Sequence, residues 1–293
     1  TGVAAALPLS LLAKYQTQAG QSFYNWRGFA MGADASVKLY AAGEKEAASL
    51  TKKCLAEILR LEKIFSLYEP DSAICKLNRE GKLNNPPPEF VSLMQQAKNF
   101  SEITHGAFDV SVQPLWESKD FAQAKRLVDY KKIKVSDEQI SFANPGMAIT
   151  LNGIAQGYIT DKVTELLRKN GVEKVLVNMG EMRALGQHAD GKKWQVGIQN
   201  PQQSEEIIKA IELDNMAIAT SGNYGARKNH LFDPATGKIV ANYQSVSVIA
   251  KTATEADALS TAFYIMPYGL AAEVAEKNGV RAVFVTNDGR VLG

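Results

Sequence analysis

Residues 148–177 read AITLNGIAQGYITDKVTELLRKNGVEKVLV. The apolar runs at 148–151 and 175–177 are predicted strands, and the amphipathic pattern at 155–170 is a predicted helix. Asn152 and Gly153 mark the turn before this helix. The order strand, turn, helix, strand indicates a mixed α/β fold, with the turn at the carboxyl end of a strand, where such folds bind ligands.

Regular patterns continue on both sides of this stretch. Apolar periodicity predicts helices at 44–65, 89–105, 254–265 and 270–277, the second of which ends at Gly106 as a left-handed cap. Further strands are predicted at 35–40, 194–198, 217–220, 245–250 and 282–286, and residues 287–289 read as a hairpin turn. The length of the chain favours one compact unit with two lobes.

Composition narrows the class of protein. The chain has 293 residues, of which 45% are apolar and 22% charged, as in a soluble globular protein. A net charge of +2 gives no reason to expect nucleic acid as a partner. Cys54 falls on the apolar side of a predicted helix and is expected to be a buried thiol, while a disulfide between Cys54 and Cys75 stays open.

The first residues resemble the end of a secretory signal. Residues 1–13 are apolar and rich in small side chains, so residues 1–20 are expected to be a residual export signal or an N-terminal extension, and 21–293 the functional domain. An ordinary N-terminal helix is the alternative. The stretch is too short to cross a bilayer, which needs about 20 residues.

Two glycine-containing stretches are candidates for ligand binding. The turn from Asn152 to Tyr158 opens a helix, where free N–H groups suit a phosphate, although a plain strand-to-helix turn has the same pattern. A second stretch, Thr220-Ser221-Gly222, leads to His230 and Asp233. His230 is the best candidate for a general base because imidazole titrates near neutral pH. The alternative is a surface histidine beside a β-turn.

Two further stretches carry acids, hydroxyls or aromatic rings. Asp257 and Thr261 are four residues apart and share a helix face, so their oxygens suit Mg2+. The alternative is a helix start capped by Thr254 or Glu255. Phe108, Trp116 and Tyr68 could provide aromatic faces for a ligand ring, although core packing is the commoner role.

Read in order, these stretches resemble the FAD:protein FMN transferase family, also called the ApbE family. The resemblance covers residues 28–290 and rests on seven motifs. They are Met31-Gly32; Phe65-Ser66-Leu67-Tyr68 with Asp71-Ser72, Ile74 and Leu77-Asn78; Gly106 to Leu115; Gly153 to Tyr158 with Asp161; Thr220 to Tyr224; His230 to Gly237; and Ala256 to Thr261.

The resemblance implies a role for each matching residue. Asp257 and Thr261 would bind Mg2+ together with a backbone carbonyl near Gly153, and Asp257 and His230 would be the catalytic residues, His230 helping to deprotonate the acceptor hydroxyl. The residues expected to line the FAD site are Met31, Tyr68, Phe108, Asp109, Gln156, Thr220, Ser221 and Gly222. The implied fold is a two-lobed α+β unit related to the T-fold.

Two departures from the family pattern stand out. Gln156 occupies a position where the family usually has Lys or Glu, which removes a charge near the cofactor. Residues 178–183 read Asn-Met-Gly-Glu-Met-Arg, one residue shorter than the family's Asn-x-Gly-Gly-[Asp/Asn]-x-Arg. The shorter form resembles the NosX-type accessory proteins of nitrous-oxide respiration.

The resemblance implies Mg2+-dependent transfer of FMN from FAD to a Ser or Thr hydroxyl of a partner flavoprotein, with release of AMP. The expected partner is a membrane-bound electron-transfer flavoprotein, and the expected location is the periplasm. An FAD pyrophosphatase and a non-enzymatic periplasmic FAD carrier are the alternatives. A carrier would have no need of Asp257, Thr261 and His230 together.

Overall fold

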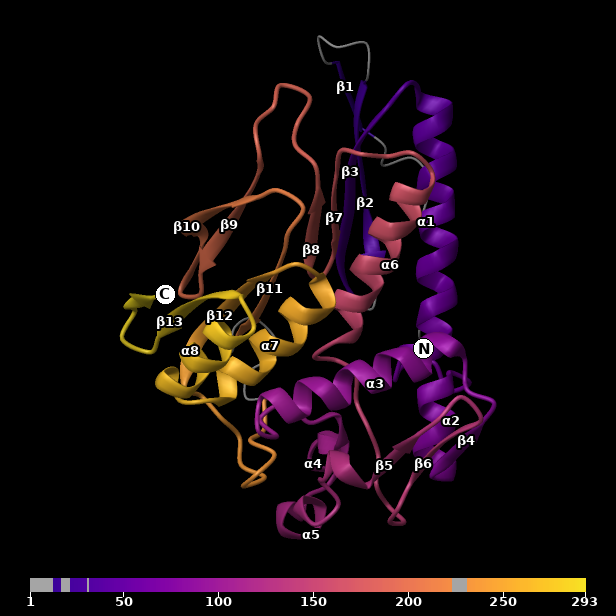
Figure 1. The fold of residues 1–293 in the computed structure, drawn as a ribbon, viewed down its shortest axis with the longest axis vertical. Coiled ribbons are helices and arrows are strands. Elements are labelled where there is room, and N and C mark those ends of the chain that lie inside the picture. Colours follow the sequence, from indigo (N-terminus) through magenta and orange to yellow (C-terminus); the bar gives the residue numbers. More distant parts are fainter. Residues whose placement is uncertain (1–12, 17–21, 31, 223–230) are drawn as a thin grey trace.

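One large antiparallel sheet organises the molecule (Figure 1). A computed structural model describes residues 13–16, 22–30, 32–222 and 231–293. Within these ranges the sheet has nine strands in the order β1-β2-β3-β7-β8-β11-β12-β13-β14, and each strand runs antiparallel to its neighbours. The strands are β1 (Ala13–Gln16), β2 (Ser22–Ala30), β3 (Ala33–Ala41), β7 (Val175–Met179), β8 (Met182–Leu185), β11 (Ala217–Gly222), β12 (Tyr243–Ala250), β13 (Arg281–Thr286) and β14 (Val291–Leu292).

Four helices cover one face of this sheet. They are α1 (Glu44–Phe65), α6 (Ala155–Lys169), α7 (Ala253–Ile265) and α8 (Tyr268–Lys277). α1 contacts β2 and β3, α6 contacts β7 and β8, α7 contacts β11 and β12, and α8 contacts β13. The apolar stripe of α1 is buried as predicted, including Cys54, whose thiol is free. The main core therefore consists of apolar side chains buried between these helices and the sheet.

The opposite face of the sheet is partly covered by a two-stranded hairpin. β9 (Trp194–Asn200) and β10 (Gln203–Leu213) pair with each other and not with the large sheet. Trp194, Ile211 and Leu213 of the hairpin pack on Leu176 and Ile218 of the sheet in a second apolar core. The large sheet is thus buried on both faces over its central strands.

A smaller part of the fold lies at the foot of the view in Figure 1. It contains the helices α2 (Ala73–Glu80), α3 (Pro88–Ile103), α4 (Gln113–Glu117) and α5 (Phe121–Lys125), and a small sheet of β4 (Lys82–Asn84), β6 (Gln139–Phe142) and β5 (Ile133–Val135). Two 3-10 turns, η2 (Val110–Val112) and η3 (Tyr130–Lys132), complete it. The predicted two-lobed α+β unit is confirmed.

The strand predicted at 148–151 is wrong. The N–H and C=O of Ile149 both bond to the carboxamide of Asn78, each at 2.8 Å, and the Thr150 N–H donates to the Val110 carbonyl at 2.8 Å. These backbone groups are satisfied outside any ladder, so the segment does not belong to a sheet. The turn before α6 therefore does not follow a strand, and α6 is no crossover between parallel strands.

Candidate active site

Nine of the predicted site residues line one cavity of about 740 Å3. The cavity lies where the β2–β3 and β7–β8 turns and the end of β11 meet the start of α6 and one side of α7. The predicted residues that line it are Phe108, Asp109, Gly153, Gln156, Thr220, Ser221, Gly222, Asp257 and Thr261. Segments far apart in the sequence are thus brought to one place.

Three predicted residues are not placed there. Tyr68 is 75% exposed and does not line this cavity, so its part in the FAD site stays a prediction. Met31 and His230 lie outside the described residues. The turn after His230 has the expected form, since Asp233 accepts hydrogen bonds from the Ala235 N–H at 2.8 Å and the Thr236 hydroxyl at 2.7 Å.

Asp257 is the buried acid of the cavity. Its carboxylate accepts the Gly157 N–H at 2.9 Å, which ties α7 to the first turn of α6. Burial raises the pKa of this carboxyl to about 7 although the bond from Gly157 opposes the shift. An ionised carboxylate buried in this way is costly unless a cation is close to it.

Close packing at Gly157 sets the position of Asp257. A Cβ atom at Gly157 would lie 2.2 Å from the Ala253 carbonyl oxygen and 2.8 Å from Cβ of Asp257. Only glycine allows α6 and α7 to approach to this distance. The second glycine of the predicted turn therefore has a packing role.

Hydroxyl groups surround the next turn of α7. Thr261 Oγ1 lies 3.2 Å from Ser221 Oγ, which lies 2.8 Å from Ser260 Oγ. Gly153 is so close that a Cβ atom there would lie 2.8 Å from Thr261 Oγ1. Gly153, from the segment before α6, and Thr261, from α7, are therefore in close contact.

Phe108 and Asp109 shape the wall of the cavity. Asp109 accepts hydrogen bonds from the Ser111 N–H at 2.7 Å, the Ser111 hydroxyl at 2.6 Å and the Tyr130 N–H at 3.1 Å, while burial raises its pKa. Phe108 is buried against Phe100, with ring centroids 6.4 Å apart. Both residues fix the loop that follows α3, so they combine a structural contact with a place in the cavity wall.

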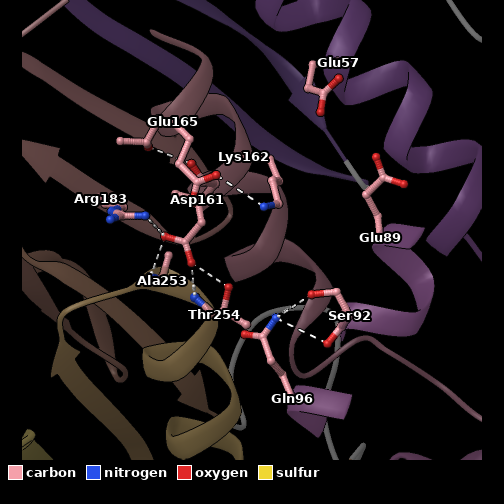
Figure 2. A network of polar contacts seen from close by, with 12 residues as sticks. Glu57, Glu89, Ser92, Gln96, Asp161, Lys162, Glu165, Arg183, Ala253 and Thr254 are labelled. Atoms are coloured by element: carbon pink, nitrogen blue, oxygen red, sulfur yellow. Dashed lines mark hydrogen bonds and ion pairs between the residues drawn. The ribbon is translucent and has the colours of Figure 1, made fainter. Parts of the chain in front are cut away.

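A buried carboxylate fixes the start of α7 (Figure 2). Asp161 of α6 accepts the N–H groups of Ala253 and Thr254 at 2.9 Å each, the Thr254 hydroxyl at 2.5 Å and Arg183 Nη1 at 2.6 Å. The helix cap itself is Thr252, which accepts the Glu255 N–H at 3.2 Å, so the alternative of a cap at Thr254 or Glu255 is wrong. Through Asp161 the helix that carries Asp257 is joined to α6 and β8.

One further acid in the cavity was not predicted as a site residue. Glu181, in the β7–β8 turn, accepts the Thr220 N–H at 3.1 Å. Burial and then the charge of Asp257 raise the pKa of its carboxyl well above the usual range. The only indication in the sequence was the shortened motif at 178–183, which pointed to an unusual turn but not to a functional role for Glu181.

The cavity suits a hard cation. Its described lining contains four acids, Asp34, Asp109, Glu181 and Asp257, and no Lys, Arg or His. Carboxylate and hydroxyl oxygens are the donors that Mg2+ prefers. Among the described residues no group of three or more His, Cys, Asp or Glu side chains could hold a metal, so hydroxyl and backbone oxygens must complete the set. The residues present fit Mg2+ on these terms.

Within the described ranges, no helix has both the length and the apolar character needed to span a membrane.

Comparison with known proteins finds similar chains that cover most of this one. FAD:protein FMN transferase of Haemophilus influenzae is 30% identical over 318 residues, which cover 97% of this chain and 91% of that protein. The Escherichia coli K12 protein of the same name is 27% identical, over 90% of this chain and 82% of its own length.

Solved structures show the same fold. The apo form of the Pseudomonas stutzeri flavinyl transferase ApbE matches with a TM-score of 0.82 and 30% identity, covering 94% of both chains. The Vibrio cholerae flavin transferase ApbE matches with a TM-score of 0.83 and 25% identity, over 93% of this chain and 97% of that one. The ApbE family model matches residues 31–284. The chain therefore belongs to the ApbE family.

Proposed function

We propose that this protein is an FAD:protein FMN transferase that joins FMN to a Ser or Thr hydroxyl of a partner flavoprotein. The observation that carries the proposal is the meeting of Gly153, Asp257 and Thr261 in one cavity of a chain whose relatives bear that enzyme name. Each of the three comes from a motif of the family and each lies where an oxygen can face the same space.

The proposed reaction is a phosphoryl transfer. The acceptor oxygen attacks the phosphorus of the FMN half of FAD, a new P–O bond forms, and the P–O bond to the AMP half breaks. The hydroxyl proton passes to a base and AMP leaves with the bond's electron pair. Such transfers depend on positioning and on neutralising charge, because the protein need form no covalent bond itself.

Different residues of the cavity would bind the metal ion and the flavin nucleotide. Asp257 and Thr261, with a backbone carbonyl near Gly153, would hold Mg2+, which supplies charge neutralisation at the diphosphate. The cavity wall formed by Phe108, Gln156 and the end of β11 would bind the flavin nucleotide. Because no described side chain in the lining is cationic, the carboxylates alone would repel a diphosphate.

Three roles rest on the family motifs. His230 would accept the proton of the acceptor hydroxyl, and Met31 and Tyr68 would contact FAD. The order of these motifs along the chain supports the assignments.

Location and partner are part of the same proposal. The apolar, small-residue character of residues 1–13 supports export to the periplasm, and the shortened motif at 178–183 supports a role in nitrous-oxide respiration. The proposed client is a membrane-bound electron-transfer flavoprotein with a short Ser/Thr target motif.

The test is to follow the nucleotide products by chromatography, with and without an acceptor domain. Transfer predicts AMP without free FMN, only when both acceptor and Mg2+ are present. AMP and FMN in equal amounts without acceptor would identify an FAD pyrophosphatase. Intact FAD retained on the protein under all conditions would identify a carrier.

A further inference from the structure

Glu181 is held in its place by several backbone contacts. Its carbonyl oxygen accepts the Met179 N–H and the Thr160 hydroxyl, both at 3.1 Å. The preceding Gly180 has φ 102°, a conformation that favours glycine, and its N–H donates to Asn178 Oδ1 at 3.0 Å. The turn therefore has little freedom to move the Glu181 side chain away from the cavity.

Gln156 closes the other side of this turn. A Cβ atom at Gly180 would lie 2.6 Å from Gln156 Nε2, so the carboxamide is packed directly on the glycine. The two departures from the family pattern are thus in contact. One removes a charge at position 156, and the shortened turn places a carboxylate at position 181.

The carboxylate itself bonds to the strand that carries Ser221. Glu181 Oε2 accepts the Thr220 N–H, and the next residue along β11 is Ser221, whose hydroxyl bonds to Thr261. Among the described residues no hydrogen bond is formed to Oε1 of Glu181, and Glu181 lines the cavity. One oxygen thus fixes the side chain to β11 and the other is left for a ligand.

Charge in the cavity makes a cation the fitting ligand. Glu181 and Asp257 both line the cavity. No Lys, Arg or His in the described lining neutralises them. Two carboxylates that face one buried space are stable together only when they share a proton or a cation.

We propose that Glu181 is a second carboxylate ligand of the Mg2+ site, binding the cation through Oε1 opposite Asp257. This inference rests on the proposed function, because it adds a residue to the metal site proposed there. The site then carries two negative charges, which strengthens its hold on a divalent ion before the diphosphate of FAD arrives.

The test measures metal affinity without any flavin. Mn2+ is titrated into the FAD-free full chain, and free Mn2+ is followed by its electron paramagnetic resonance signal. Glu181→Gln keeps an oxygen for the Thr220 N–H and removes the charge, so its Mn2+ dissociation constant is expected to rise by about ten-fold or more. Glu273→Gln, an exposed glutamate of α8 paired with Lys277 at 2.6 Å, is the matched control and should bind as the unmodified chain does.

The Asp257→Asn variant distinguishes failure of the Glu181 inference from failure of the metal site in the proposed function. If Asp257→Asn weakens Mn2+ binding and Glu181→Gln changes it less than two-fold, Glu181 only clamps β11 and the inference is wrong. If neither variant weakens binding, the metal site of the proposed function fails as well.

A measurement on the unmodified chain covers the case in which Glu181→Gln does not fold. Infrared difference spectra on Mg2+ addition are compared for unlabelled protein and protein with 13C-labelled glutamate side chains. A carboxylate band that Mg2+ perturbs and the label shifts is expected, because Asp257 is an aspartate and Glu181 a glutamate. Perturbed bands that are all insensitive to the glutamate label would overturn the inference.

Discussion

Asp257 combines two demands on one side chain. It is buried where it meets the first turn of α6, and as the proposed metal ligand it would have to be ionised. Its pKa of about 7 is the physical result of the first demand, since burial favours the neutral form. Metal binding would meet the second by favouring the charged form.

The stability of the metal-free protein should therefore depend on pH in a defined direction. The pKa of Asp257 rises from 3.8 to about 7 on folding, so between these values the folded state binds more protons than the unfolded state. The contribution of this group to the free energy of unfolding falls as pH rises from about 4 to about 7. Thermal melts without metal at pH 5.5 and pH 8 measure the fall, and Asp257→Asn should reduce it.

Mg2+ provides the complementary control. It should raise the melting temperature clearly at pH 8, where the carboxylate is ionised, and little at pH 5.5, where protons compete for it. An equal rise at both pH values would show that Asp257 is not the titrating ligand.

Sequence motifs predicted most of the residues that line the cavity, but the contacts between distant segments could be found only from the structure. Asp257, Thr261 and Gly153 were predicted from short motifs and do meet. Glu181 was missed because its partners, Thr220 and Asp257, are distant in sequence and no local pattern shows that the β7–β8 turn faces them. A close approach of this kind is a property of the tertiary fold.

Among the helices, the crossing of α6 and α7 does most to place the site. Gly157→Ala should push the two helices apart, because its Cβ would meet the Ala253 carbonyl at 2.2 Å and Asp257 Cβ at 2.8 Å. We expect a loss of about 1–3 kcal/mol in the free energy of unfolding and weaker Mg2+ binding. Denaturant unfolding and metal titration measure the two effects.

Gly269→Ala is the matched control. It lies in α8, where an added Cβ meets nothing within 4 Å, so stability should stay the same or rise by about 0.5–1 kcal/mol. A similar loss for both variants would mean that helix crossing at Gly157 is not the cause.

The Asp161 network is the second element-level feature. Asp161→Ala would leave Arg183 without its buried partner and two N–H groups at the start of α7 without their acceptor (Figure 2). We expect a destabilisation of about 3–5 kcal/mol by denaturant unfolding. Glu165→Ala removes a more exposed ion pair with Lys162 and should cost less than about 1 kcal/mol.

Element prediction succeeded where one face of a segment is apolar. The predicted helix at 44–65 has the bounds of α1, because its buried residues follow the helical period. β10 was not predicted, since its register shifts near Ile207, which is 61% exposed, and the bulge interrupts the alternation. The wrong strand prediction at 148–151 has another cause. The same apolar run is expected whether its backbone N–H and C=O groups bond to a neighbouring strand or, as here, to the side chain of Asn78.

At the scale of the whole molecule, the fold class could be predicted from the sequence, but the relative direction of the strands could not. The order strand, helix, strand indicated a mixed α/β fold without giving strand direction, and in the structure β7 pairs antiparallel with β3 and β8. Which strands become neighbours depends on burial of both sheet faces, and the hairpin β9–β10 supplies that burial on one side. The α+β unit was predicted correctly because the sequence motifs resemble those of a family with that fold.

The transfer of FMN to a protein is the central claim, and the intact mass of an acceptor domain tests it most directly. The acceptor is incubated with FAD and Mg2+ and either this protein or its Asp257→Asn variant, and then weighed by mass spectrometry. We predict a gain equal to one FMN group less water with the unmodified protein, lost on chelation of Mg2+ and absent with Asp257→Asn. An acceptor of unchanged mass in the presence of consumed FAD would contradict the claim, whereas an equal gain with Asp257→Asn would contradict only the role of Asp257.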